Sequence, residues 1–134
     1  GEAKRFLILD AAMNDLIRPA LYNGHHGLRP VKQPGADAPL MPVDVVGPVC
    51  ESGDTFAKDR MLPLIEEGDL VAFGTAGAYG AVMASTYNTR LLVPEVLIDG
   101  DHYAVIRPRQ TYEELIGMDR IPDWLQTGSK DHAA

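Results

Sequence analysis

The sequence has little of several residue types and patterns, and each scarcity excludes a class of protein. It contains one cysteine in 134 residues, so no disulfide can form within the chain, which is typical of the reducing cytosol. No apolar run approaches the roughly 20 residues of a membrane-spanning helix, and no stretch is typical of a signal peptide. Lys and Arg do not cluster, and the net charge is −7, which argues against nonspecific binding to nucleic acid. We therefore expect a cytoplasmic protein that binds neither membranes nor nucleic acids.

Short apolar runs bounded by Gly, Pro and Asp dominate the chain. Its length and its 46% hydrophobic content match one compact domain. The lengths of the runs and the turns between them predict a mainly β fold, an antiparallel barrel or sandwich, with one or two short helices. We expect strands at residues 5–9, 43–49, 69–73, 81–86, 91–98 and 102–106. We expect a surface loop over the proline-rich residues 30–42 and a flexible tail over residues 126–134.

Two segments in the second half of the chain have specific local signals. Asp99-Gly100 lies between apolar runs and predicts a tight hairpin turn, while Pro94 indicates an edge strand or a bulge. Residues 110–117 predict a short helix, with Thr111 as N-cap, a capping box closed by Glu114, and a stop at Gly117. A second short helix is expected within residues 13–22, where Asn14 is a candidate cap and Pro19 limits the length.

The single cysteine, Cys50, lies in the sequence GPVCESGD, after an apolar run and before a polar turn. An isolated cysteine is often a small buried hydrophobe without chemistry. A polar turn, however, is where functional side chains collect. The adjacent Glu51 favours the neutral thiol over the thiolate, and a neutral thiol can donate a proton, so the local charge favours an acid over a nucleophile.

Four further features could carry a ligand, and each has an ordinary structural alternative. The segment FGTAGAYGAVM matches no phosphate-loop pattern, and its glycines are better explained by a bend between strands. Tyr79 in this segment lies between small residues, so its ring could be presented to a ligand or could equally lie in the core. Arg18 and Tyr22 are four residues apart and could together bind a carboxylate, although a surface ion pair is the default for such an arginine. Adjacent His25 and His26 point apart on a regular element, so we predict no metal site. None of the four lysines lies in an apolar setting suited to Schiff-base chemistry.

The order of several motifs along the chain resembles a known family. LDAAMNDLIRPALY, GPVCESGD, GAYGAVMASTYNTR, EVLIDGD and VIRPRQTYEELI together resemble the carboxy-terminal domain of the diaminopimelate decarboxylases, within the fold type III, alanine-racemase-like pyridoxal-phosphate decarboxylases. The resemblance runs from about residue 5 to residue 125. It implies that residues 1–125 are a carboxy-terminal β-domain like that of alanine racemase. It also implies a preceding (β/α)₈ barrel, absent here, that carries the Schiff-base lysine. The chain begins with Gly1 and not with Met, which agrees with its being a fragment of a longer protein. We expect this fragment alone to be inactive.

The resemblance also implies roles for individual residues. Cys50 resembles the general acid that reprotonates Cα in the partner subunit's site, and Glu51 resembles the residue that recognises the distal ammonium of the substrate. Arg18 and Tyr22 match the residues that hold the distal carboxylate, and Tyr79 matches a tyrosine near cofactor and substrate. Asp54 is implied to be an interface residue.

The implied protein is therefore a homodimeric decarboxylase that converts meso-2,6-diaminopimelate to L-lysine with pyridoxal 5'-phosphate. Arginine, ornithine or carboxynorspermidine as the substrate is the alternative within the class. A non-catalytic β-barrel binding module is the alternative outside it.

Overall fold

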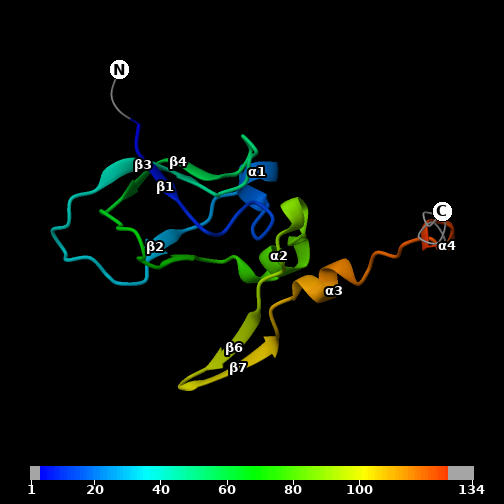
Figure 1. The fold of residues 1–134 in the computed structure, drawn as a ribbon. Helices are drawn as coiled ribbons and strands as arrows, with labels where there is room; N and C mark the ends of the chain where they lie inside the picture. The colour runs from blue at the N-terminus through cyan, green and yellow to red at the C-terminus, as the bar shows by residue number, and fades with distance from the viewer. Residues whose placement is uncertain (1–3, 127–134) are drawn as a thin grey trace. The chain divides into compact units, whose positions relative to one another are not determined.

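A computed structural model describes residues 4–126 (Figure 1). The chain divides into two compact units, one ending at Leu92 and the other beginning at Val93, and the assignment of residues 1–125 to one β-domain stays a prediction. The elements of the first unit are β1 (Phe6–Ile8), α1 (Arg18–Tyr22), β2 (Leu28–Pro30), β3 (Met41–Val46), β4 (Thr55–Leu62), β5 (Val71–Phe73), α2 (Gly77–Gly80) and the 3₁₀ turns η1 (Ala81–Met83) and η2 (Tyr87–Thr89). Those of the second are β6 (Glu95–Asp99), β7 (His102–Arg107), α3 (Tyr112–Ile116) and α4 (Asp123–Gln126).

The largest sheet of the first unit has the order β1-β3-β4. β3 and β4 are antiparallel, as expected, but β1 pairs with β3 in parallel. Between β1 and β3 the chain passes through α1 and β2, a connection long enough to return the chain in the same direction. The expectation of a purely antiparallel arrangement is therefore wrong for this pair.

A β-bulge interrupts the pairing of β3 with β4 beside Asp44. Asp59 there has a φ of 48°, and its backbone N–H donates to Oδ1 of the buried Asp44 at 2.9 Å. The Lys4 ammonium lies 2.7 Å from Oδ2 of the same carboxylate. The bond to Lys4, and after it the N–H of Asp59, hold the pKa of Asp44 below its ordinary value, and the carboxylate raises the pKa of Lys4.

A small core joins this sheet to the antiparallel pair formed by β2 and β5. Phe56 of β4 and Phe73 of β5 stack at a tilt, with ring centroids 4.8 Å apart. The buried cluster around them contains Leu16, Val45, Phe56 and Leu62. Since Leu16 comes just before α1, burial of its side chain fixes the start of that helix against the sheet.

Several predicted elements of the first unit are corrected by the structure. β2 and β4 were not predicted. In β4 (TFAKDRML), charged residues interrupt the alternation of apolar and polar residues that would indicate a strand. Residues 81–86 were predicted as a strand but begin with η1, because α2 passes directly into this turn. Asn14 is not a helix cap: α1 has Ile17 at its N-cap, with Pro19 in its first turn.

The second unit contains the predicted hairpin and helix, but β6 begins at Glu95, so residues 91–94 of the strand predicted at 91–98 are not part of a strand. β6 and β7 are antiparallel, with Asp99 opposite His102 and Gly100 at a φ of 56°. Thr111 and Glu114 form the complete capping box of α3, and Gly117 follows the helix. The predicted tail lies outside the described residues, apart from Gln126 at the end of α4.

The described strands form a mainly β fold in three separate sheets, and no barrel closes among residues 4–126. Within the same range, no helix has the length and hydropathy needed to cross a bilayer.

Candidate functional site

The β3–β4 loop, residues 47–54, carries Cys50 and Glu51 and is organised by Asp54. This carboxylate is buried, and it accepts the backbone N–H of Val49 at 2.8 Å and that of Met13 at 2.7 Å. A Cβ at Gly47 would collide with the same carboxylate, so any larger residue there would have to displace Asp54 from these bonds. Asp54 is therefore an internal support of the loop, and its expected role as an interface residue is wrong because its side chain is covered within this chain.

The tip of the loop presents Cys50 and Glu51 on the surface. Cys50 is exposed, which excludes a buried hydrophobe without chemistry. Oε1 of Glu51 accepts the N–H of Gly53 at 3.2 Å, and Oε2 accepts the hydroxyl of Tyr87 at 3.4 Å. The Glu51 carboxylate is thus held from both sides beside a free thiol.

Arg18, the first residue of α1, contacts an aromatic ring. Its Cζ lies 5.5 Å from the ring centroid of Tyr79, within the range of a cation–π interaction. Among the described residues Arg18 forms no ion pair, so the ordinary interpretation as a surface ion pair is wrong. Tyr22, one turn later on α1, is 61% exposed.

Tyr79 lies in α2, a helix of four residues, and its side chain is 63% exposed. The buried Gly80 beside it faces Leu16, since a Cβ there would lie 3.8 Å from Cδ1 of that leucine. Gly80 therefore faces the core beside Leu16 while the Tyr79 ring lies outside it, which supports ring presentation over a core position.

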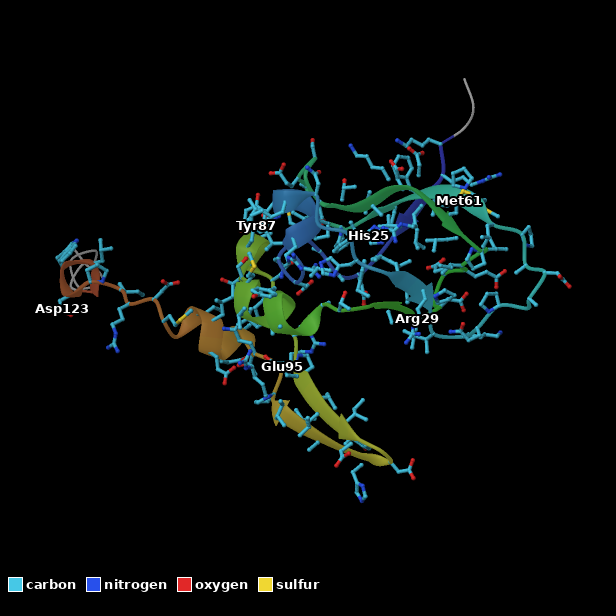
Figure 2. The ribbon with its side chains drawn as sticks, turned by 180° about the vertical axis from the view of Figure 1, so that it is seen from behind. His25, Arg29, Met61, Tyr87, Glu95 and Asp123 are labelled. Atoms are coloured by element: carbon cyan, nitrogen blue, oxygen red, sulfur yellow. The ribbon has the colours of Figure 1, made fainter. Side chains whose placement is uncertain are left out.

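The segment after α2 is tied to the segment before α1. The backbone N–H of Ser85 donates to the carbonyl of Asn14 at 2.9 Å, and Nδ2 of Asn14 donates to the Ser85 carbonyl at 3.2 Å. Further along, Arg90 donates to the carbonyl of Asp10 and lies 3.8 Å from the Asp15 carboxylate. These bonds fix the short stretch that carries Tyr87 (Figure 2).

Tyr87 was not predicted as a site residue. Its block, TYNTR, is among the motifs that carry the resemblance, but nothing in the spacing of that block indicates a contact with Glu51, which is 36 positions away. In Figure 2, Tyr87 and Met61 lie toward opposite ends of the first unit. The site is therefore at the end of the unit where β4 begins.

The structure thus brings the predicted Arg18 and Tyr79 together, and it pairs the predicted Glu51 with Tyr87, which was not predicted. Residues 79–87 are continuous, so one segment supplies the tyrosine of each pair. Among the described residues, Cys50 and Tyr22 bond to no other member of this set. The arrangement offers one fixed cation, one fixed carboxylate, exposed phenol rings and a thiol on a single unit.

The adjacent His25 and His26 each have a partner within the described residues. His25 is exposed and pairs through Nδ1 with Arg60, whereas Nδ1 of the buried His26 contacts the Gly74 carbonyl at 3.2 Å. In the described part of the chain, no three His, Cys, Asp or Glu side chains group as metal ligands.

Comparison with known proteins gives a consistent result. The family model described as "Pyridoxal-dependent decarboxylase, C-terminal sheet domain" matches residues 1–77. Diaminopimelate decarboxylase from Zymomonas mobilis is 49% identical over 125 residues, which are 93% of this chain and 29% of that protein. The crystal structure of diaminopimelate decarboxylase from Helicobacter pylori complexed with L-lysine superposes with a TM-score of 0.79 at 46% identity, over 88% of this chain and 29% of that one.

A lysine/ornithine decarboxylase from Vibrio vulnificus, complexed with cadaverine, is less similar. Its TM-score is 0.56 at 30% identity, over 66% of this chain and 24% of that one. The chain therefore spans under a third of the length of the relatives that it matches.

Proposed function

Because this chain belongs to the pyridoxal-dependent decarboxylases as their C-terminal sheet domain, we propose that its whole protein converts meso-2,6-diaminopimelate to L-lysine and carbon dioxide. The chain then supplies substrate-binding and proton-donating residues to a site whose remainder comes from an N-terminal barrel and from the partner subunit of a homodimer. We include in the proposal the cytoplasmic location and a barrel or sandwich arrangement of the sheets in the assembled protein.

The observation that carries the proposal is the fixed position of Glu51 and Arg18 on one unit. Meso-diaminopimelate has an ammonium and a carboxylate at each end, so an enzyme that acts at one end must hold both groups at the other. The Glu51 carboxylate, held by Gly53 and Tyr87, is complementary to the distal ammonium. The Arg18 guanidinium and the Tyr22 hydroxyl are complementary to the distal carboxylate.

Cys50 is the proton donor in this scheme. Its thiol is exposed on the residue next to Glu51, so a substrate whose distal ammonium binds Glu51 lies within reach of the loop tip. The S–H proton is transferred to Cα after carbon dioxide has left, and the thiolate then regains a proton from solvent. A positioned donor of this kind contributes roughly 10²–10⁴-fold to the rate.

Pyridoxal 5'-phosphate, when bound, supplies the electron sink for the bond that breaks. The chain is suited to contact the cofactor but not to anchor it. Tyr79 offers an exposed ring, but Lys4 is engaged with Asp44, and Lys32 and Lys58 are exposed. Lys130 lies outside the described residues. We therefore place the anchoring lysine in the barrel.

The direct test uses the full-length protein loaded with cofactor. Carbon dioxide release is measured from meso-diaminopimelate, ornithine, arginine and carboxynorspermidine at equal concentrations. We expect release from meso-diaminopimelate alone, because the other substrates lack the distal pair of ammonium and carboxylate. Preferred release from any other substrate would overturn the assignment.

A further inference from the structure

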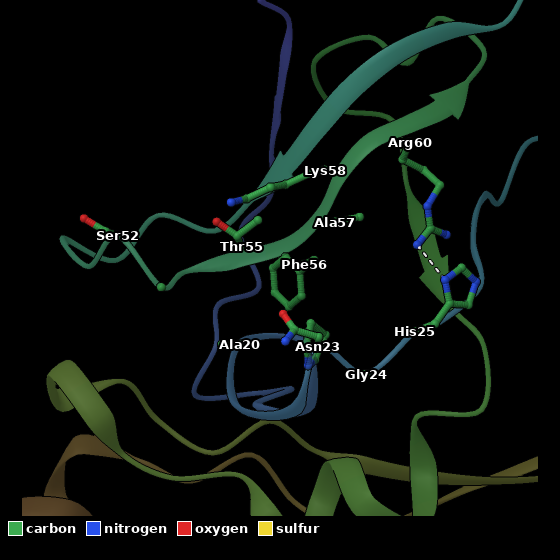
Figure 3. Close-up of a pocket in the computed structure, with 12 residues that line it drawn as sticks. Ala20, Asn23, Gly24, His25, Ser52, Thr55, Phe56, Ala57, Lys58 and Arg60 are labelled. Atoms are coloured by element: carbon green, nitrogen blue, oxygen red, sulfur yellow. Dashed lines mark hydrogen bonds between the residues drawn. The ribbon is translucent and has the colours of Figure 1, made fainter.

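A second pocket lies on the first unit, between α1 and β4 (Figure 3). Its volume is about 380 Å³, within the range of small-molecule sites. The proposed substrate-binding residues do not line it. The two sites share two elements: α1, which contributes Pro19 and Ala20 to the pocket, and the loop that follows β3, which contributes Ser52 and Gly53.

The lining of the pocket differs in charge from the rest of the chain. The chain has 19 acidic and 12 basic residues, yet the pocket contains Lys58 and Arg60 and no Asp or Glu. This excess of positive charge favours an anion over a cation. The lining also includes the apolar residues Pro19, Phe56 and Ala57.

The polar groups of the pocket are either fixed or available to a ligand. Arg60 donates through Nη1 to the His26 carbonyl at 3.0 Å and pairs through Nη2 with Nδ1 of His25 at 3.3 Å, so its guanidinium is held in position. By contrast, the Lys58 ammonium and the hydroxyls of Ser52 and Thr55 bond to no other group in the described part of the chain. Figure 3 shows Lys58 and Thr55 on one stretch of β4 and Arg60 further along it.

We propose that this pocket is a second binding site, for a small organic anion that carries a phosphate or a carboxylate on an apolar body. The anionic group pairs with Lys58 and accepts from the hydroxyls of Ser52 and Thr55, while the apolar body lies on Phe56 and Pro19. Charge-assisted hydrogen bonds of this type are the stronger ones in proteins. The site is separate from the proposed decarboxylation, and its ligand contacts the same loop that carries Cys50.

The test uses full-length holoprotein and phenyl phosphate, which combines a phosphate with an apolar ring, titrated by calorimetry. Lys58→Gln removes the available cation from an exposed position, and Lys32→Gln is the matched control, since Lys32 is an exposed lysine of the same unit outside this pocket. We expect saturable binding that is weakened at least about 5-fold by Lys58→Gln, by analogy with charged hydrogen bonds. Lys32→Gln should bind as the wild type does.

Four results would overturn the proposal. They are no saturable binding, equal binding by both variants, loss of binding when meso-diaminopimelate is present, and binding only when the cofactor has been removed. The last two would assign the pocket to the substrate or to the cofactor phosphate. The binding of phenyl phosphate is measured directly, so this test remains valid even if the decarboxylation assay fails. Conversely, absence of phenyl phosphate binding does not contradict the proposed decarboxylation.

Discussion

The guanidinium of Arg18 lies over the ring of Tyr79, although 60 residues separate the two along the chain. The contact joins α1 to α2 and orients both side chains at the proposed substrate site. An exposed cation–π contact contributes only about 0.5–1 kcal/mol. We therefore expect its main effect on where the guanidinium lies, and little effect on the stability of the unit.

Arg18→Lys in the full-length enzyme should raise KM for meso-diaminopimelate about 10–100-fold, because a lysine cannot form the two parallel bonds that an arginine makes with a carboxylate. Tyr79→Phe removes the hydroxyl but keeps the ring, so it should retain the stacking contact and the arginine's orientation. Steady-state kinetics of both variants provide the measurement. An unchanged KM in Arg18→Lys would contradict the assignment of Arg18 to the distal carboxylate.

Cys50→Ala should lower kcat about 10²–10⁴-fold while the affinity for cofactor is unchanged, since only the proton donor is lost. Turnover is followed by carbon dioxide release and cofactor binding by the absorbance of the bound group. Cys50 is exposed, so the substitution leaves no cavity and the fold should be retained. Wild-type turnover in this variant would exclude Cys50 as the acid.

Glu51→Gln should raise KM roughly 10–100-fold, because a charged hydrogen bond to the ammonium, about 1.5–3 kcal/mol, is lost. Tyr87→Phe removes one of the two bonds that hold the carboxylate and should give a smaller increase in KM with kcat nearly unchanged. Glu67→Gln, at an exposed position in the β4–β5 connection, is the matched control for the loss of one negative charge. If Glu51→Gln and Glu67→Gln have the same KM, Glu51 does not bind the ammonium.

Asp54→Ala should destabilise the protein by roughly 3 kcal/mol or more, since two backbone N–H groups lose a charged acceptor. Gly47→Ala should have a similar effect, because its Cβ collides with the Asp54 carboxylate. Denaturant unfolding of both variants measures the change. Ser52→Ala, in the same loop but exposed, should be within about 0.5 kcal/mol of the wild type.

Acid should remove the contribution of Asp44 to stability. Its pKa is lowered in the folded protein, so this contribution is present above the ordinary carboxyl pKa and is lost as the pH falls through the folded value. Lys4, whose pKa is raised, contributes below the ordinary lysine pKa and loses its contribution as the pH rises through the folded value. Asp44→Asn keeps an acceptor for the Asp59 N–H but loses the ion pair. The difference in unfolding free energy between wild type and Asp44→Asn should therefore shrink between neutral and strongly acidic pH, and a constant difference would contradict this account.

Local signals in the sequence were sufficient for the hairpin turn and for α3 of the second unit, but they did not predict α4. The Asp-Gly turn and the capping box each depend on residues within a few positions of one another, and both predictions are confirmed. The missed strand β4 and the mistaken strand at 81–86 show the opposite case. There the backbone conformation depends on contacts with distant segments, such as the β3–β4 pairing and the bonds between Asn14 and Ser85.

The sequence by itself determined the family, the mainly β composition and the residue types at the candidate site, since motif order and local propensity depend on the chain alone. Tertiary structure decided which of those residues meet. The bonds of buried Asp54 fix the loop that presents Cys50 and Glu51, and packing of α2 beside Leu16 places Tyr79 next to Arg18. The bonds between Asn14 and Ser85 hold the segment in which Tyr87 meets Glu51. The parallel pairing of β1 with β3 and the positively charged pocket beside α1 likewise arise only when segments far apart in sequence pack together.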